Sequence, residues 1–282
     1  MRVNAYVLVA DPNFLGASLS AYYDHVDRIV LSYDETATSW TGTPLPVDEC
    51  LAIVKEVDVD GKCVHSPGRY ARLDHDPLDN DTFQRQAALD EASGGADWVL
   101  QLDTDEVMTD PDVFFTALHR AEGTGTSALA YPSRWLYSRV AAGRYLEAST
   151  RLGRPVASFP GPLAVRAGTR LELARQTTCP TYRVDLRPWN TDPHQHQETP
   201  VHQVVAPHEA VLHFSWVRDP DTMRRKFGWS GHTAMYSDPA VFRRWASRSA
   251  RPRATAATSL LRRRDWYRLV TVPEPPGGAP WA

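Results

Sequence analysis

The sequence predicts an α/β fold in which a mixed, mostly parallel sheet is flanked by helices. Two runs rich in β-branched residues, 2–10 and 28–33, enclose a helical pattern of apolar residues over 14–23. A second helical pattern over 82–92 leads directly into another apolar run at 97–102. Strands that alternate with helices in this order lie parallel to one another in a sheet.

Each element predicted in the N-terminal part rests on a local feature of the sequence. Residues 2–10 carry one Arg and no small-residue cleavage site, so we interpret them as a first strand and not as a signal peptide, which favours a cytoplasmic protein. Residues 36–78 are rich in Pro, Gly and Asp, and we expect a loop-rich region with one or two strands, including the short apolar run at 51–57. Polar residues at 79–81 offer caps for the second helix, and a pair of glycines ends it.

Beyond residue 110 the pattern predicts three strands followed by a helix. The strands are 127–137, 162–166 and 211–217, and the helix is 221–229. The last stretch, 273–282, is rich in Pro and Gly, so we expect an extended or disordered tail.

Composition limits the class of protein. The 282 residues are 42% hydrophobic and 23% charged, which is ordinary for a globular chain with a real core. No apolar stretch approaches the roughly 18 to 20 residues that a membrane span requires. The three cysteines are widely spaced and include no CxxC pair, so neither a disulfide framework nor a zinc ribbon is indicated.

Charge is distributed unevenly along the chain. Acidic residues outnumber basic ones 21 to 7 in residues 1–110, whereas basic residues lead 12 to 9 in 111–220 and 12 to 4 in 221–282. An acidic first part is suited to hold cations and a basic last part to hold anions. Solvated faces of opposite sign would give the same counts.

Carboxylates follow three predicted strands at the point where each strand ends. They are Asp11, Asp34 and the acids of "DWVLQLDTDEVM", namely Asp103, Asp105 and Glu106. In an open parallel sheet, ligands bind outside the carboxyl ends of the strands, so an acidic cleft is expected there. Closely spaced acids repel each other unless a cation shares the site, and oxygen ligands suit Mg²⁺ or Mn²⁺. The alternative is a set of exposed turn acids, because Asp is common in turns.

One chemistry that uses such acids is phosphate hydrolysis. "LDTDEV" fits the pattern DxDx[TV], in which the first Asp is the nucleophile of Mg²⁺-dependent phosphatases. Those enzymes also need a Lys and a later acidic pair. After Asp105 the only lysine is Lys226, and no later GDxxxD or DD pair follows.

The second chemistry is glycosyl transfer, and three stretches favour it. They are "VADPNFLGASLSAYYDHVDRIVLSYDETATS", "FQRQAALDEASGGADWVLQLDTDEVM" and "VLHFSW". In these stretches the chain resembles the nucleotide-diphospho-sugar transferases of the GT-A fold, particularly the family 2 glycosyltransferases. The resemblance covers about residues 3–110 and a short island near 213. It implies a nucleotide-sugar-binding half at 1–110 that ends in the DxD motif, and a half of the same domain at 111–272 that binds the acceptor and completes the metal site.

The resemblance also implies roles for individual residues on the donor side. Asp34 would contact the nucleoside, with Asp11 and Arg85 bordering the same pocket, and Asp103 would hold the ribose or a metal-bound water. Asp105 would bind a divalent metal, Mn²⁺ or Mg²⁺, with His213 as the second protein ligand; a core histidine is the alternative for His213. A basic side chain of the helix at 221–229, for which we choose Lys226, would reach the β-phosphate, although a solvated basic helix face is equally compatible with the pattern.

An inverting transferase needs a base near the acceptor hydroxyl, usually a carboxylate. The candidates at the family's usual separation from the DxD are Asp185, Asp192, Glu198 and Glu209, of which we favour Asp185 and then Glu209. Many relatives carry an acid in a "VHE" element, where this chain has "PVHQVV" with Gln203, so the base and the inverting outcome stay open. Aromatic faces suit flat acceptors, and we expect contacts from Trp135 and Trp216.

The sequence therefore predicts a metal-dependent glycosyltransferase that moves a sugar from a nucleoside diphosphate donor to a small molecule or cell-envelope precursor. A Mg²⁺-dependent phosphatase and a noncatalytic nucleotide-sugar-binding module are the alternatives. The basic, aromatic stretch RRWASRSARPR is compatible with nucleic acid or with an anionic membrane surface. An overall pI near 6.4 and the acidic first part argue against nucleic acid as the main partner.

Overall fold

The computed structural model of the chain describes residues 1–186, 200–231 and 233–272. The predicted tail at 273–282 and two of the candidate bases, Asp192 and Glu198, lie outside these ranges.

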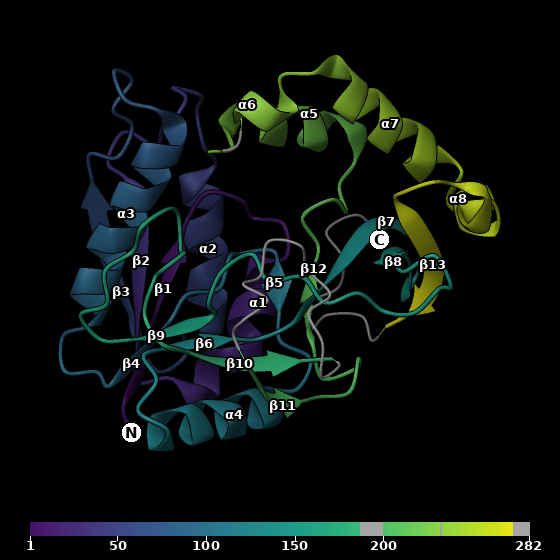
Figure 1. Cartoon of the computed structure of the whole chain (residues 1–282). Coiled ribbons are helices and arrows are strands. Elements are labelled where there is room, and N and C mark those ends of the chain that lie inside the picture. The colour runs from purple at the N-terminus through teal and green to yellow at the C-terminus, as the bar shows by residue number, and fades with distance from the viewer. Residues whose placement is uncertain (187–199, 232, 273–282) are drawn as a thin grey trace.

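An eight-stranded sheet forms the body of the protein (Figure 1). Its order is β11 (Val201–Val204), β10 (Thr181–Asp185), β6 (Ala128–Ala130), β9 (Ala164–Arg166), β4 (Trp98–Leu100), β1 (Val3–Leu8), β2 (Arg28–Asp34) and β3 (Cys63–Gly68). Of these described strands, β9 alone runs antiparallel to its neighbours. The predicted mixed, mostly parallel sheet is therefore confirmed.

Helices cover both faces of this sheet. Successive side chains of β1 point to opposite faces, so that Ala5 and Val7 join one core while Tyr6 and Leu8 join the other. The first core also includes apolar residues of three helices, α1 (Leu15–Tyr22), α2 (Val47–Val57) and α4 (Pro111–Gly123). The second core is closed by one helix, α3 (Pro77–Ala92).

A second, five-stranded sheet adjoins the carboxyl edge of the first. Its order is β13 (Trp266–Thr271), β8 (Arg144–Ser149), β7 (Ser133–Ala141), β12 (Val211–His213) and β5 (Glu106–Val107). Because β5 begins only six residues after β4 ends, and β7 begins three residues after β6 ends, the chain passes directly between the two sheets.

The C-terminal helices form an arc from the N-terminal body toward β13 (Figure 1). They are α5 (Pro220–Trp229), α6 (Thr233–Tyr236), α7 (Pro239–Ala250) and α8 (Pro252–Ala257), and short 3₁₀ turns lie at η1 (Tyr23–His25) and η2 (Ser259–Leu261). No helix in the described ranges is both long and apolar enough to cross a bilayer.

Most predicted elements are present, with clear exceptions. Residues 51–57, predicted as a strand, belong to α2, because Val47, Cys50 and Val54 are buried at helical spacing. The strand predicted at 211–217 ends at His213, and residue 214 begins a turn. The strand predicted at 127–137 is split between β6 and β7, and α4 and α7 were not predicted.

Candidate functional site

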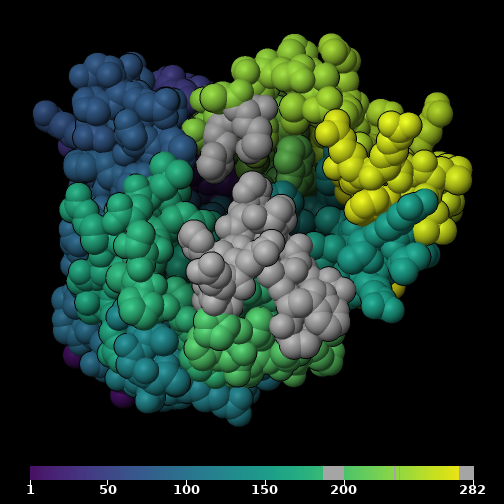
Figure 2. Space-filling model, viewed as in Figure 1, coloured from purple at the N-terminus to yellow at the C-terminus, as the bar shows by residue number. Residues whose placement is uncertain are grey.

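A cavity of about 620 Å³ lies where the two sheets and the helical arc meet. Figure 2 shows the surface hollowed between the N-terminal body and the C-terminal helices. Strand ends from the first sheet, His213 at the end of β12, and residues of α5 all line it. Nine of the residues predicted for the site are in its lining: Asp11, Asp34, Arg85, Asp103, Asp105, Trp135, His213, Trp216 and Lys226.

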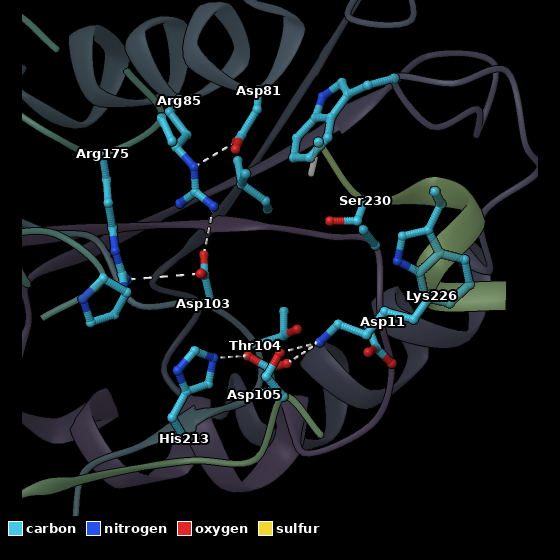
Figure 3. Close-up of a pocket in the computed structure, with 18 of the residues that line it drawn as sticks. Asp11, Asp81, Arg85, Asp103, Thr104, Asp105, Arg175, His213, Lys226 and Ser230 are labelled. Atoms are coloured by element: carbon cyan, nitrogen blue, oxygen red, sulfur yellow. Dashed lines mark hydrogen bonds and ion pairs between the residues drawn. The ribbon is translucent and has the colours of Figure 1, made fainter. Parts of the chain in front are cut away.

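Asp105 lies at the centre of a cluster of cationic groups (Figure 3). One carboxylate oxygen, Oδ2, lies 2.5 Å from Lys226 Nζ and 3.1 Å from Arg218 Nη2. The other, Oδ1, faces His213 Nε2 at 3.3 Å. Burial by itself raises the pKa of Asp105, but Lys226, His213 and Arg218 outweigh it and hold that pKa well below 3.8. Asp105 is therefore an anion at neutral pH.

The other two acids of the motif have different surroundings. Glu106 is fully buried and receives both arms of the Arg175 guanidinium, at 2.5 and 2.6 Å, so it is part of the framework. Asp103 keeps 31% of its side chain exposed and accepts from Arg85 Nη2 at 2.8 Å. Burial raises the pKa of Asp103, yet Arg85 and then Arg175 lower it below 3.8 on balance. Of these acids, Asp103 presents the most surface to the cleft.

His213 is placed by β12, whose pairing with β5 sets it opposite Glu106. Its Nδ1 is 3.8 Å from Glu106 Oε1 and has no hydrogen-bond partner among the described residues. If the ring proton is on Nε2, the ring donates to Asp105 Oδ1. If it is on Nδ1, Nε2 and Oδ1 are two acceptors, and a cation bound between them would satisfy both.

The carboxylate of Asp105 and the imidazole of His213 together fit Mn²⁺ or Mg²⁺. A carboxylate oxygen and an imidazole nitrogen 3.3 Å apart can bind one ion together, and such ions take their remaining ligands from substrate phosphates and water. Within the described ranges no group of three or more His, Cys, Asp or Glu side chains is arranged to hold a metal. Among the described residues, the side chains placed to bind one ion at this point are Asp105 and His213.

Asp34 and Asp11 shape the loops that border the cleft. Asp34 Oδ1 accepts from the backbone and hydroxyl of Thr36, and Oδ2 from the amides of Tyr70 and Ala71 at 2.8 and 2.9 Å. All four acceptor positions of this carboxylate are therefore engaged within the protein. Asp11 accepts from Asn13 through Oδ1 and from Arg218 through Oδ2 at 2.9 Å.

Two arginines of the site were not identified from the sequence. Arg218 lies in the turn after β12 and joins Asp11 to Asp105, 207 and 113 residues away along the chain. Arg175 belongs to a loop near β9, and its side chain passes so close to Gly161 that a Cβ there would lie 2.5 Å from Arg175 Cγ. No local motif marks either residue, because each acts through long-range contacts.

Asp185 and Glu209, predicted as candidates for the base, are not in the lining of the cleft. Asp185 is fully buried and forms an ion pair with Arg183. Glu209 accepts from the backbone amide of Ala206 at 2.5 Å, and so caps its own turn. The carboxylates that do line the described cleft, Asp11, Asp34, Asp81, Asp103 and Asp105, all have a cation or a hydrogen-bond donor.

Aromatic side chains also line the cleft. Trp135 meets His213 edge to face, with ring centroids 5.4 Å apart. Trp216 stacks on Tyr137 at 5.7 Å. Tyr236 of α6 also lines the cleft, and burial, assisted by the charge of Asp105, raises its pKa to about 12, so its phenol is a donor at neutral pH.

No protein-family model and no curated protein matches the chain. Two similar solved structures are 4-diphosphocytidyl-2C-methyl-D-erythritol synthase from Anaerococcus prevotii and mannose-1-phosphate geranyltransferase from Thermus thermophilus. The first is 12% identical, covers 59% of this chain and 70% of that one, and has a TM-score of 0.35. The second is 16% identical, covers 60% and 51%, and has a TM-score of 0.29. At these scores the likeness assigns no family, and the proposals below depend on the geometry of the cleft.

Proposed function

We propose that the protein is a glycosyltransferase that takes a sugar from a nucleoside diphosphate donor with a divalent metal. The observation that carries this proposal is the arrangement at the end of β4, where Asp105, His213 and Lys226 meet in a cleft of about 620 Å³. That volume suits a ligand of nucleotide-sugar size. The family resemblance of the N-terminal stretches supports the same reading.

The balance of charge explains why the donor would bind together with a metal. Six carboxylates, Asp11, Asp34, Asp81, Asp103, Asp105 and Glu106, stand in or next to the cleft against four cationic side chains, Arg85, Arg175, Arg218 and Lys226. Without counting His213, two negative charges are left uncompensated. A diphosphate alone would be repelled, whereas a diphosphate with a divalent cation adds no net charge.

Residues of this chain would share the work of stabilising the leaving group. Asp105 and His213 would hold the metal, which supplies positive charge against the departing diphosphate when it is bound. Lys226 Nζ, held by Asp105 and by Ser215 Oγ at 3.0 Å, can turn toward the same phosphate from α5. Positive groups placed where charge develops stabilise the transition state most.

Asp103 would contact the ribose or a metal-bound water, since it is the motif acid that is accessible from the cleft. Asp34 and Asp11 would fix the loops that border the nucleoside. Asp185 and Glu209 have no part in the proposed reaction, because neither lines the cleft. The proposal leaves the choice between inversion and retention open.

An assay with a set of nucleotide sugars tests this function. Purified protein is incubated with UDP-, GDP-, ADP-, dTDP- and CDP-sugars and Mn²⁺ or Mg²⁺, and release of the nucleoside diphosphate is measured. We expect one donor class to be consumed, with loss of the activity in Asp105→Asn and full retention in Glu209→Gln. Binding of a nucleotide sugar without release or transfer under any condition would instead identify a noncatalytic module.

A phosphatase is the competing activity, and an aryl phosphate substrate separates the two. Asp103 Oδ1 accepts from Arg85, while Oδ2 lies 3.9 Å from Arg175, beyond hydrogen-bonding distance, so Oδ2 would be the nucleophile of such a reaction. Hydrolysis of the aryl phosphate that is abolished in Asp103→Asn would overturn the glycosyltransferase proposal.

A further inference from the structure

A second cavity of about 380 Å³ adjoins the cleft. The two cavities share four residues, Trp135, Ala148, Val156 and Trp216. Trp135 also contacts His213, so the shared wall stands next to the point where the donor phosphates would lie. The two cavities are therefore neighbours that meet at these four residues.

The lining of this second cavity is aromatic and positively charged. Its rings are those of Trp135, Tyr137, Trp216, Trp266 and Tyr267. Its charged members are Arg244, Arg248 and Asp265, which leaves one net positive charge. Flat apolar bodies pack well on such rings, and a net positive lining selects for an acid.

The two arginines differ in how far they are already engaged. Arg248 donates to Tyr267 Oη at 2.9 Å and to Asp265 Oδ2 at 3.0 Å, so it is part of the wall. Arg244 is exposed and makes no hydrogen bond or ion pair with any described residue. Arg244 and Arg248 lie four residues apart on α7 and hence on one face, together with Val241. Arg244 is therefore available to bind an anionic group.

We propose that this second cavity is the acceptor site, and that the acceptor is a small molecule with a flat apolar body and an acidic group. Arg244 binds the carboxylate or phosphate of the acceptor, the aromatic side chains hold its body, and its hydroxyl passes the shared wall of Trp135 and Trp216 toward the donor. This assignment rests on the proposed glycosyltransferase function, because an acceptor has meaning only where a donor binds.

The test uses full-length protein without nucleotide and three acidic probes: 4-hydroxyphenylacetate, phenyl phosphate and benzenesulfonate. The methyl ester of 4-hydroxyphenylacetate is the neutral control, and dissociation constants are measured by ligand-observed NMR titration. We expect at least one acid to bind about tenfold more tightly than the ester, as one charge-assisted contact allows. Arg244→Gln should abolish that preference.

Arg243→Gln is the matched control variant. Arg243 is the neighbouring exposed arginine of α7 and does not line the cavity, so its removal should leave the preference for acids unchanged. If no acid binds better than the ester, or if both variants weaken binding equally, the acceptor assignment is wrong. Binding to phosphatidylglycerol vesicles that both variants weaken equally, without selective binding of an acid, would also overturn it in favour of a charged surface.

Failure of this assignment and failure of the proposed function give different results. Donor binding is followed separately, by the thermal shift that nucleoside diphosphates cause with metal. Nucleotide binding without acid selectivity removes the acceptor site alone. Acid selectivity that depends on Arg244, without any nucleotide binding, removes the glycosyltransferase and with it the role of this cavity as an acceptor site.

Discussion

At the scale of single residues, Asp105 shows how burial and charge decide a role. It is only 5% exposed, and it remains ionised because Lys226, His213 and Arg218 surround it. An uncompensated buried carboxylate would instead take up a proton. The neighbouring Glu106 is still more buried, yet its bidentate pair with Arg175 turns it into a framework residue. An accessible acid, Asp103, and a framework acid, Glu106, thus stand within four residues of sequence.

Lys226 offers a clean test of phosphate binding. Its side chain is 16% exposed, so Lys226→Met should fold, and nucleoside diphosphate binding should weaken about 10- to 100-fold, which is the range for one charge-assisted contact. Isothermal titration with the preferred nucleotide and metal measures the change. Arg224→Met, on the same helix but 60% exposed and paired with Asp221, is the control and should bind as the wild type does. Equal affinity of the Lys226 variant would exclude its phosphate role.

The lowered pKa of Asp34 predicts how the free energy of unfolding changes with pH. Burial raises its pKa, but the bonds from Thr36, Ala71 and Tyr70 outweigh burial and lower the pKa below 3.8. A carboxylate with a lowered folded-state pKa stabilises the fold above its unfolded-state value, and the contribution is lost as the pH falls through the folded-state pKa. Asp34→Asn places an NH₂ group either against the amides of Tyr70 and Ala71 or against the amide of Thr36, so donor faces donor in both orientations. The change should cost about 1–3 kcal/mol at neutral pH.

Urea unfolding of the wild type and Asp34→Asn across pH measures this contribution. The difference in the free energy of unfolding should be constant between about pH 5 and 7 and should shrink below about pH 3.8 as the wild-type carboxylate takes up its proton. A difference that stays the same down to the acid limit would show that the charge of Asp34 does not contribute.

At the scale of elements, the sequence predicts those whose signal is local. The strands β1, β2 and β4 follow from local apolar runs. The helix α3 was predicted at 82–92 with caps at 79–81, but it begins at Pro77, because its N-terminal cap is Asp76. The stretch at 51–57 was wrongly predicted as a strand because its apolar run has the length of a strand. Its helical spacing is seen only when Val47 and Cys50 are included. The helix α4 could have been predicted from two residues at its start. Asp110 caps the helix by accepting from the backbone amide of Val113, and Pro111 occupies its first position.

The candidate site divides in the same way. Strand ends mark Asp11, Asp34, Asp103 and Asp105, because the carboxyl edge of a parallel sheet is predictable from element order. Arg218 and Arg175 are reached only through the tertiary fold. The candidate base Asp185 was chosen by its separation from the DxD motif, but it does not line the cleft. Asp185 ends β10, which lies four strands away from β1 in the sheet, and it is buried beside Arg183.

The helix α7 depends on one anchor. Trp245 is 1% exposed, packs on Phe242, and donates from Nε1 to the carbonyl of Trp216 at 3.0 Å. Trp245→Ala should cost about 3–5 kcal/mol by leaving a cavity, and should weaken binding of the acidic probe as well, because α7 carries Arg244. Urea unfolding and the NMR titration measure the two effects. Leu261→Ala, at a side chain that is 86% exposed, should change stability by less than about 0.5 kcal/mol.

At the scale of the whole molecule, two sheets and a helical arc enclose one cleft. The arc is tied to the N-terminal body where Thr41 donates to the carbonyl of Gly228 at 2.7 Å, and Gly231 lies against Trp40 and Asp81. Residues from both ends of the chain therefore meet around the cleft, and strands from beyond residue 110 complete the first sheet. The acid-rich part supplies Asp105, the proposed metal ligand, and the basic part supplies Lys226 and Arg244.

The measurement that tests the central claim most directly is a thermal-shift screen of UDP, GDP, ADP, dTDP and CDP, each with Mn²⁺, with Mg²⁺ and with EDTA. A ligand that binds only the folded state raises the melting temperature according to its concentration relative to its dissociation constant. The account predicts that one nucleotide stabilises the wild type strongly with metal, weakly with EDTA, and not in Asp105→Asn. Stabilisation by no nucleotide, or equal stabilisation with metal and with EDTA, would contradict it.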